Sequence, residues 1–226
     1  MATRSYYTLV ASLPSLPHFE QAEFLTLSRK QLEQRLTMLT PEDLGQLRLA
    51  EGLCLWQRQP ITRTTEQMII GYRIFQQHAT NESLRDFVDL RMGQRTALVA
   101  LRRRRRGLGP PAADEVWGVG PAVRRIAASW DSADLGLGPA FAWVERARTL
   151  LEEGNAIELE RMLMESAWQR LSRIADSVPF GFEQVFAFVF RWDIEQRWLT
   201  WDADAAKNRF QELITEVTRD HQQLFA

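Results

Sequence analysis

Residues 185–201, with the sequence VFAFVFRWDIEQRWLTW, decide the fold that this chain is expected to adopt. The first six are apolar and by themselves resemble a buried strand, but the length of the stretch favours a helix. At about 100° per residue, the apolar side chains form two stripes on opposite sides of that helix. One stripe holds Val185, Phe188, Val189, Trp192 and Leu199, and the other holds Phe186, Phe190, Ile194, Trp198 and Trp201.

Charged residues lie between the two stripes. Arg191 is four residues before Glu195, and Asp193 is four residues before Arg197, a spacing that brings opposite charges together on a helix surface. A helix at the surface of a protein needs only one apolar stripe. The sequence therefore predicts a central helix with neighbours on both sides, and with its charges along the edges.

Further helices are predicted along the rest of the chain, with no convincing strand and no short repeat. Residues 5–17 contain Pro14 and Pro17 and are expected to be extended or irregular. Thr40 followed by Pro41, and Asn81, are predicted helix starts. The expected helices cover about 19–39, 41–59, 65–78, 81–106, 122–130, 140–151, 157–175, 182–201 and 203–224. The predicted fold class is all-α, a two-lobed array of helical bundles.

The segment 107–121 differs in composition from the sequence around it. It reads GLGPPAADEVWGVGP, and its seven glycine and proline residues are typical of a boundary between units. We therefore expect an N-terminal helical lobe at 1–106, a linker at 107–121 and a C-terminal lobe at 122–226, or else one continuous domain.

Length and composition exclude several classes of protein. With 226 residues, 45% of them hydrophobic, the chain can bury a substantial core. No apolar run approaches the roughly 18 residues that a membrane span requires. The single cysteine, Cys54, cannot form an internal disulfide, which fits a reducing cytosol. The formal net charge is −1, and the pI is about 6.3.

The arginines Arg102, Arg103, Arg104, Arg105 and Arg106 form the most conspicuous charge feature. Residues 81–106 carry eight arginines against three acidic residues, a net charge of +5, so the rest of the chain carries −6. One interpretation is a solvated helix end whose cations suit the helix dipole. A second is a contact with an acidic protein partner. Binding of nucleic acid is a weaker alternative, because no aromatic residues are interleaved and the pI is not basic.

Arg95 is a candidate for a structural ion pair. Arg91, Arg95 and Arg102 fall on the apolar face of the helix predicted at 81–106. A buried guanidinium without a partner is costly, so at least one of them is expected to pair with a carboxylate. Arg95 is the most central of the three and is therefore the preferred candidate. The alternative is that these side chains extend along the core to reach water.

The sequence gives no sign of catalytic, metal or cofactor chemistry. His18, His78 and His221 lie far apart and lack metal-ligand spacing. Cys54 stands among Leu53, Leu55 and Trp56, as a core thiol does. No phosphate-binding loop, nucleophile elbow or dinucleotide fingerprint occurs. We expect a protein that is not an enzyme and that has no cofactor, metal or small-molecule substrate.

Four segments share a pattern with a known family. They are SYYTLVASLP at 5–14, LRDFVDLRMGQRTALVALRRRRRGL at 84–108, SADLGLGPAF at 132–141 and FAFVFRWDIEQRWLTWDADAAKNRFQELI at 186–214. Together they resemble a bacterial family of unknown function that is encoded among V/A-type rotary ATPase genes and is similar to the C (or d) subunit. Arg95 matches the pattern of the long helix. Arg91 replaces a usual acidic residue and Thr96 a usual Asn, and Leu135 replaces the Phe of an Asp-Phe-Gly-Leu segment.

The resemblance implies a non-catalytic role. It suggests an accessory or central-stalk coupling subunit that links the stalk to the membrane rotor and is built like the all-helical C subunit. The alternative is an assembly or regulatory factor for the same complex. The implied partners are stalk and rotor subunits, and Arg102–Arg106 are the expected contact residues. The implied location is the cytoplasm, with contact to the inner membrane only through the ATPase complex.

Overall fold

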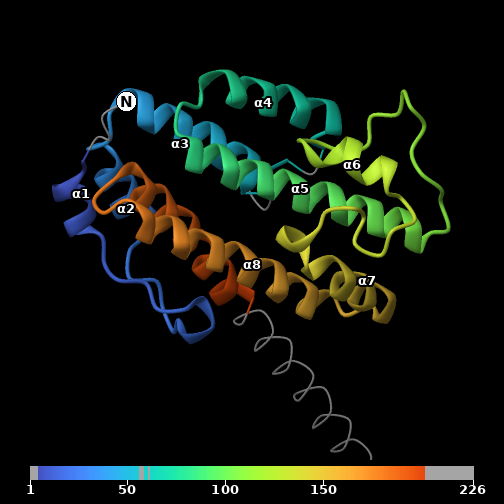
Figure 1. The fold of residues 1–226 in the computed structure, drawn as a ribbon. Coiled ribbons are helices and arrows are strands. Elements are labelled where there is room, and N and C mark those ends of the chain that lie inside the picture. Colours follow the sequence, from blue (N-terminus) through green and yellow to red (C-terminus); the bar gives the residue numbers. More distant parts are fainter. Residues whose placement is uncertain (1–4, 56–58, 61, 202–226) are drawn as a thin grey trace, which may run out of the picture.

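The computed structural model describes residues 5–55, 59–60 and 62–201, and every regular element in these ranges is helical. No strand occurs among them, so the predicted all-α fold class is confirmed (Figure 1). None of the described helices combines the length and the hydrophobicity that a membrane-spanning segment needs. The helix predicted at 203–224 lies outside the described residues, as do Trp56 and His221.

The helices can be followed by their labels in Figure 1. In chain order they are α1 Tyr7–Ser12, the 3-10 helix η1 Phe19–Gln21, α2 Arg29–Leu36, α3 Pro41–Cys54, α4 Thr65–His78, α5 Glu82–Arg105, α6 Ala122–Ala128, the 3-10 helix η3 Pro139–Phe141, α7 Trp143–Glu153 and α8 Ala156–Ser177. An unlabelled orange-red helix follows at residues 182–201, and we call it the central helix.

Several helices begin at residues whose side chains satisfy free backbone N–H groups. The Thr40 hydroxyl accepts a hydrogen bond from the N–H of Asp43, and Pro41 is the first residue of α3. Asn81 caps α5 by accepting from the N–H of Leu84 at 2.9 Å. Both predicted starts are confirmed.

The N-terminal region differs from the prediction. The short helix α1 forms in the segment that was expected to be irregular, and the single helix predicted at 19–39 is replaced by η1 and α2. A capping box between Ser28 and Gln31 starts α2 at residue 29. Upstream, Phe19 is fully buried, and its ring centroid lies 5.7 Å from that of Trp168 and 5.2 Å from that of Trp198. Burial of Phe19 therefore fixes this segment against α8 and the central helix.

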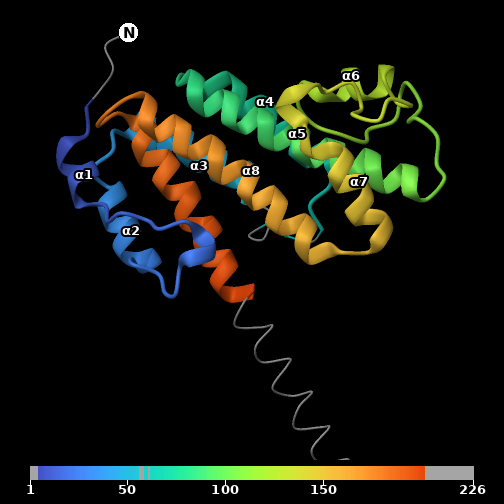
Figure 2. The same ribbon diagram turned by 60° about the horizontal axis from the view of Figure 1, so that its bottom comes forward.

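The central helix is buried on both of its apolar stripes. Phe188 is 4% exposed and Phe190 is 3% exposed, although they point to opposite sides. Phe190 packs against Phe87 of α5, with 4.9 Å between the ring centroids. On the other side, Nε1 of Trp192 donates to the carbonyl of Leu27 at 2.9 Å. Figure 2 shows this helix beside α8, on the side of α1 and α2. The prediction of a helix enclosed on two sides is confirmed.

Two of the charges on the central helix are not at its edges, contrary to the prediction. Asp193 is 5% exposed and Glu195 is fully covered. Arg191 does not pair with Glu195, because its guanidinium lies over the ring of Trp168, 5.6 Å from the centroid. No described residue donates a hydrogen bond to Glu195. Burial consequently raises the pKa of the Glu195 carboxyl.

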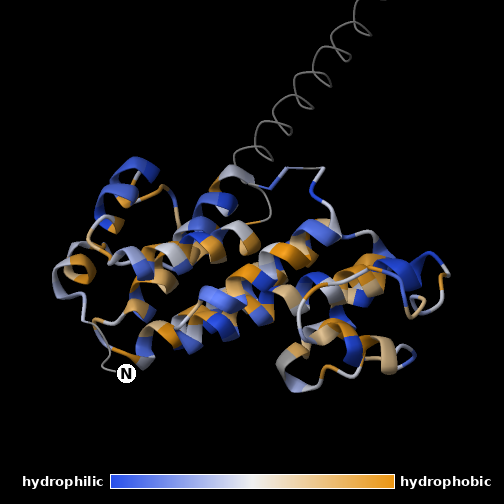
Figure 3. Cartoon of the chain, turned by 90° about the horizontal axis from the view of Figure 1, so that it is seen from above, coloured by the Kyte–Doolittle hydropathy of each residue, from blue (hydrophilic) through white to orange (hydrophobic). Residues whose placement is uncertain are grey.

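The buried apolar residues form two main clusters that meet along α5. The first core draws on residues 6–92 and 171–192 together with Val119, and the second on residues 97–163. The first half of α5 therefore belongs to one core and its second half to the other. Figure 3 shows hydrophobic and hydrophilic residues alternating along the helices, as amphipathic packing requires. Along α5 the change from one core to the other falls between Met92 and Ala97, and the segment 107–121 contributes Val119 to the first core and Trp117 to the second.

The Gly/Pro-rich segment 107–121 is packed against α5. The Thr96 hydroxyl donates to the carbonyl of Val119 at 2.8 Å and accepts from its N–H at 3.0 Å. Trp117 is buried edge-to-face against Trp130. A Cβ on Gly118 would lie 2.6 Å from Cγ2 of Thr96. Glycine is needed here so that the loop can approach the helix closely, which composition alone does not distinguish from flexibility.

Candidate functional site

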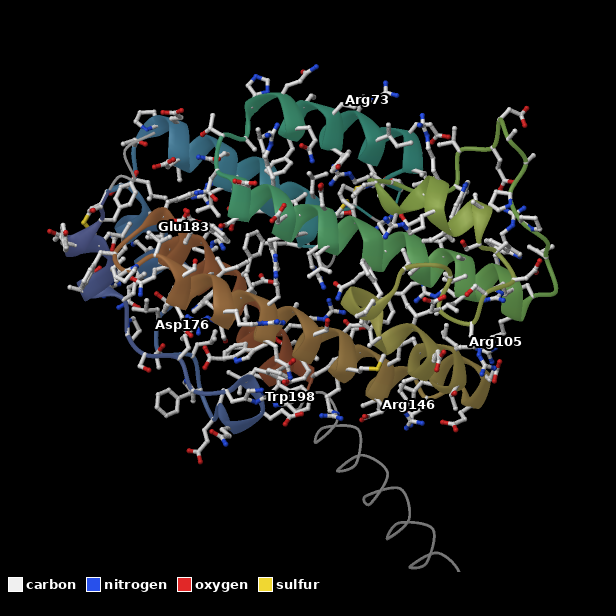
Figure 4. The ribbon with its side chains drawn as sticks, in the orientation of Figure 1. Arg73, Arg105, Arg146, Asp176, Glu183 and Trp198 are labelled. Carbon is white, nitrogen blue, oxygen red and sulfur yellow. The ribbon has the colours of Figure 1, made fainter. Side chains whose placement is uncertain are left out.

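The five arginines predicted as a contact site lie at the C-terminal end of α5, where the helix dipole favours cations. Three of them, Arg102, Arg105 and Arg106, are exposed, and we call them the arginine patch. None of the three forms a salt bridge with a described residue. Figure 4 places Arg105 at the end of α5 beside α7. Their charges are therefore available to a partner.

The other two arginines of the run hold the neighbouring loops. Arg103 donates from Nε to the carbonyl of Gly109 at 3.0 Å, and from Nη2 to Glu115 at 3.0 Å. These contacts with Arg103 lower the pKa of the Glu115 carboxyl. Arg104 donates from Nη1 to the carbonyl of Ser132 at 3.1 Å. The run thus divides into two structural residues and three exposed ones.

A groove runs beside the arginine patch, between the second half of α5 and the junction of α7 with α8. Its volume is about 300 Å³, within the range of ligand pockets. Three arginines, Arg95, Arg102 and Arg105, line it from α5. They share one face of the helix because they are spaced seven and three residues apart. The remaining lining is mostly apolar: Leu98, Val99, Leu150, Leu151, Gly154, Ala156, Leu159, Glu160 and Leu163.

Arg95 does not form the predicted ion pair within the part of the chain that the structure describes. Its side chain is half-buried in the groove, and no carboxylate of a described residue lies within salt-bridge distance. Burial lowers the pKa of its guanidinium, and the positive charges of Arg63 and Arg102 lower it further. Arg95 thus faces a cavity that already carries positive charge.

A charge cluster that the sequence pattern did not indicate lies between α5, α8 and the central helix. Arg91 donates from Nη1 to the side-chain oxygen of Gln94 at 2.7 Å. Burial lowers the pKa of the Arg91 guanidinium, and the negative charges of Glu160 and Asp193 oppose this shift. Arg197 forms a salt bridge with Glu160. The cluster surrounds a cavity of about 30 Å³, enough for one water molecule. It joins α5 to two helices, α8 and the central helix, that lie far from it in sequence.

The remaining titratable groups do not converge on a reactive centre. Burial raises the pKa of Cys54 to about 12, so its thiol is neutral near pH 7. His18 contacts Glu165 at 2.8 Å, whereas Nδ1 of His78 contacts the carbonyl of Ile74. Among the described residues, no group of three or more His, Cys, Asp or Glu side chains could hold a metal ion.

The segment 132–141 forms the turn that leads into α7. The carboxylate of Asp134 accepts hydrogen bonds from the N–H groups of Gly136 at 2.9 Å and Gly138 at 3.1 Å. Bonding to Ser132 and to these N–H groups lowers the pKa of Asp134. Leu135 has φ +56° and is fully buried in the second core. This segment therefore joins the second core through Leu135 and Leu137 and leads the chain into α7.

Comparison with known protein families gives one match. The family described as "Protein of unknown function (DUF2764)" matches residues 50–221, and the chain belongs to this family. Neither the comparison with curated proteins nor that with solved structures gives a match.

Proposed function

We propose that this protein is a non-catalytic accessory or central-stalk coupling subunit of a V/A-type rotary ATPase, linking the stalk to the membrane rotor. The arginine patch carries this proposal. Three exposed guanidiniums, none of them in a salt bridge with a residue that the structure describes, stand at the end of a helix that is buried along most of its length. Such a surface attracts an acidic partner and accelerates its association.

The sequence resemblance supports the choice of this complex in the proposal. Four segments in collinear order are similar to a family encoded with V/A-type ATPase genes and resembling the C subunit, an all-helical adaptor. An all-α chain suits that role. In this proposal the chain needs no cofactor and carries out no reaction, because other subunits hydrolyse ATP and move ions. It is cytoplasmic and reaches the inner membrane only through the complex.

Co-purification tests the proposal. A tagged copy of the full chain, expressed in its native host, is expected to retain the stalk and rotor subunits through a gel-filtration step. Retention in the assembled complex supports a subunit. Association with partly assembled intermediates alone would favour the alternative, an assembly or regulatory factor.

The contribution of the arginine patch can be measured separately. Replacing Arg102, Arg105 and Arg106 with Gln is expected to slow association with the ATPase by about tenfold at low salt and to flatten its salt dependence. A matched control replaces Lys30, Arg73 and Arg124 with Gln. These residues are exposed on α2, α4 and α6, and their replacement removes the same amount of charge. Figure 4 shows Arg73 on a different side of the molecule from Arg105. Equal slowing by both variants would assign the effect to net charge and contradict a role for the patch.

A further inference from the structure

The groove beside the arginine patch contains three guanidiniums and little negative charge to balance them. Arg95 is half-buried at one end, and Arg102 and Arg105 stand at the other. Of the described residues that line it, Glu160 alone has a carboxylate, and this is already paired with Arg197. The first residue of α8, Ala156, also lines the groove, so the positive end of that helix dipole faces the same space.

Like charges held beside an apolar surface favour a ligand that is both acidic and apolar. The leucines that line the groove belong to the second core and are at most 9% exposed, so they form an apolar floor that core packing holds in place. A small inorganic anion would leave this floor uncovered. Among the described residues, no aromatic side chain lines the groove to stack a nucleobase.

The spacing of the arginines indicates the form of the ligand. Arg95 and Arg102 are two helical turns apart, about 10 Å along the axis of α5, and Arg105 is nearly one turn further. Carboxylates seven residues apart on a second helix repeat at the same interval. A partner helix lying along α5 would therefore match the arginines in register.

We propose that the groove binds an acidic helical segment of a partner protein, whose leucine-type side chain enters the groove while its carboxylates contact Arg95, Arg102 and Arg105. This inference rests on the proposed function, because it defines the chemistry of the stalk or rotor surface that the chain would contact. It adds Arg95 and the junction of α7 with α8 to the contact site.

A synthetic peptide provides the test. Fluorescence anisotropy measures binding of the full chain to a labelled helix of roughly 20 residues that carries leucines and glutamates on one face, with glutamates seven residues apart. The same peptide with Gln in place of Glu is the ligand control. The glutamate peptide is expected to bind, with an affinity that falls as salt is raised, and the glutamine peptide to bind at least about tenfold more weakly.

Two variants locate the binding to the groove. Arg95→Gln removes a groove cation and is expected to weaken binding roughly five- to tenfold. Ala156→Glu places a carboxylate at the exposed first residue of α8, where the dipole favours it and where it neutralises the arginines. It is expected to weaken binding by a similar factor. Ile157→Glu is the matched control, because Ile157 is 68% exposed and does not line the groove. It is expected to change the affinity by less than about twofold.

Several results would overturn the inference. They are no binding of the glutamate peptide, equal binding of the glutamine peptide, or equal weakening by Ala156→Glu and Ile157→Glu. A single-stranded oligonucleotide that binds as tightly as the peptide and loses affinity in the same variants would assign the groove to nucleic acid. Failure of the tagged chain to co-purify with the ATPase, with peptide binding intact, overturns the proposed function but leaves the chemistry of the groove standing.

Discussion

Replacing Gly120 with alanine tests whether the segment 107–121 is packed against α5. Gly120 has φ +86°, and a left-handed conformation costs a residue with a side chain roughly 1–2 kcal/mol. An added Cβ would also lie 2.8 Å from Cβ of Met92, which α5 holds in place. Overpacking of this kind costs about 1–3 kcal/mol. The substitution is therefore expected to lower the free energy of unfolding by roughly 2–5 kcal/mol.

Gly109 provides a control within the same loop. A Cβ added there meets no atom within 4 Å, and its φ is not positive. Gly109→Ala is expected to leave the free energy of unfolding unchanged or to raise it by about 0.4–1 kcal/mol, because alanine reduces the entropy of the unfolded chain. Urea unfolding followed by circular dichroism measures both variants. Thermal unfolding is expected to show a Tm lower by roughly 10 °C for Gly120→Ala alone.

A flexible linker would behave differently. Alanine at either glycine would then stabilise the protein slightly or have no effect, since neither position would be held in one conformation. Equal free energies of unfolding for Gly120→Ala and Gly109→Ala would refute the conclusion that this loop is packed against α5.

Three further predictions follow from burial. Phe188→Ala and Phe190→Ala should each lower the free energy of unfolding in urea by about 3–5 kcal/mol, whereas Phe24→Ala, at a side chain that is 68% exposed, should change it by less than about 0.5 kcal/mol. Burial raises the pKa of Glu195, so ionisation of this carboxyl destabilises the folded state above its unfolded pKa of about 4.3. Glu195→Gln should therefore raise Tm near neutral pH, and this gain should disappear as the pH falls towards 4. Cys54, with its pKa raised to about 12, should react with a thiol reagent at pH 8 only after denaturation; rapid reaction of the folded protein would contradict its burial.

The parts of the fold that depend on local chemistry could be predicted from the sequence. Thr40 with Pro41 and Asn81 start helices because their side chains or rings suit the first turn, whatever surrounds them. The two apolar stripes of the central helix likewise follow from the helical repeat, and Phe188 and Phe190 are both buried.

The division into cores could not be predicted in the same way. Composition marked 107–121 as a boundary because glycine and proline are common in linkers. At Gly118 the absence of a side chain serves instead to admit Thr96 of α5. Only the position of α5 next to the loop distinguishes the two uses, and that position depends on contacts between distant residues.

The candidate site shows the same limit. The arginine run was evident from the sequence, but the groove was not, because its second wall comes from the junction of α7 with α8. Helical periodicity placed both Arg91 and Arg95 on the apolar face. It could not show that the acidic residues Glu160 and Asp193 would approach Arg91. The crossing of α8 and the central helix over α5 decides that choice.

The course of α5 connects the proposed contact site to the rest of the molecule. Its 24 residues extend about 36 Å without an internal break. The first half packs in the core that contains the central helix, while the second half carries the arginine patch and the groove. Arg103 and Arg104 additionally anchor the loops around its end. A partner held by the arginines would therefore contact the same continuous helix that packs in the first core, which is consistent with the proposed coupling role.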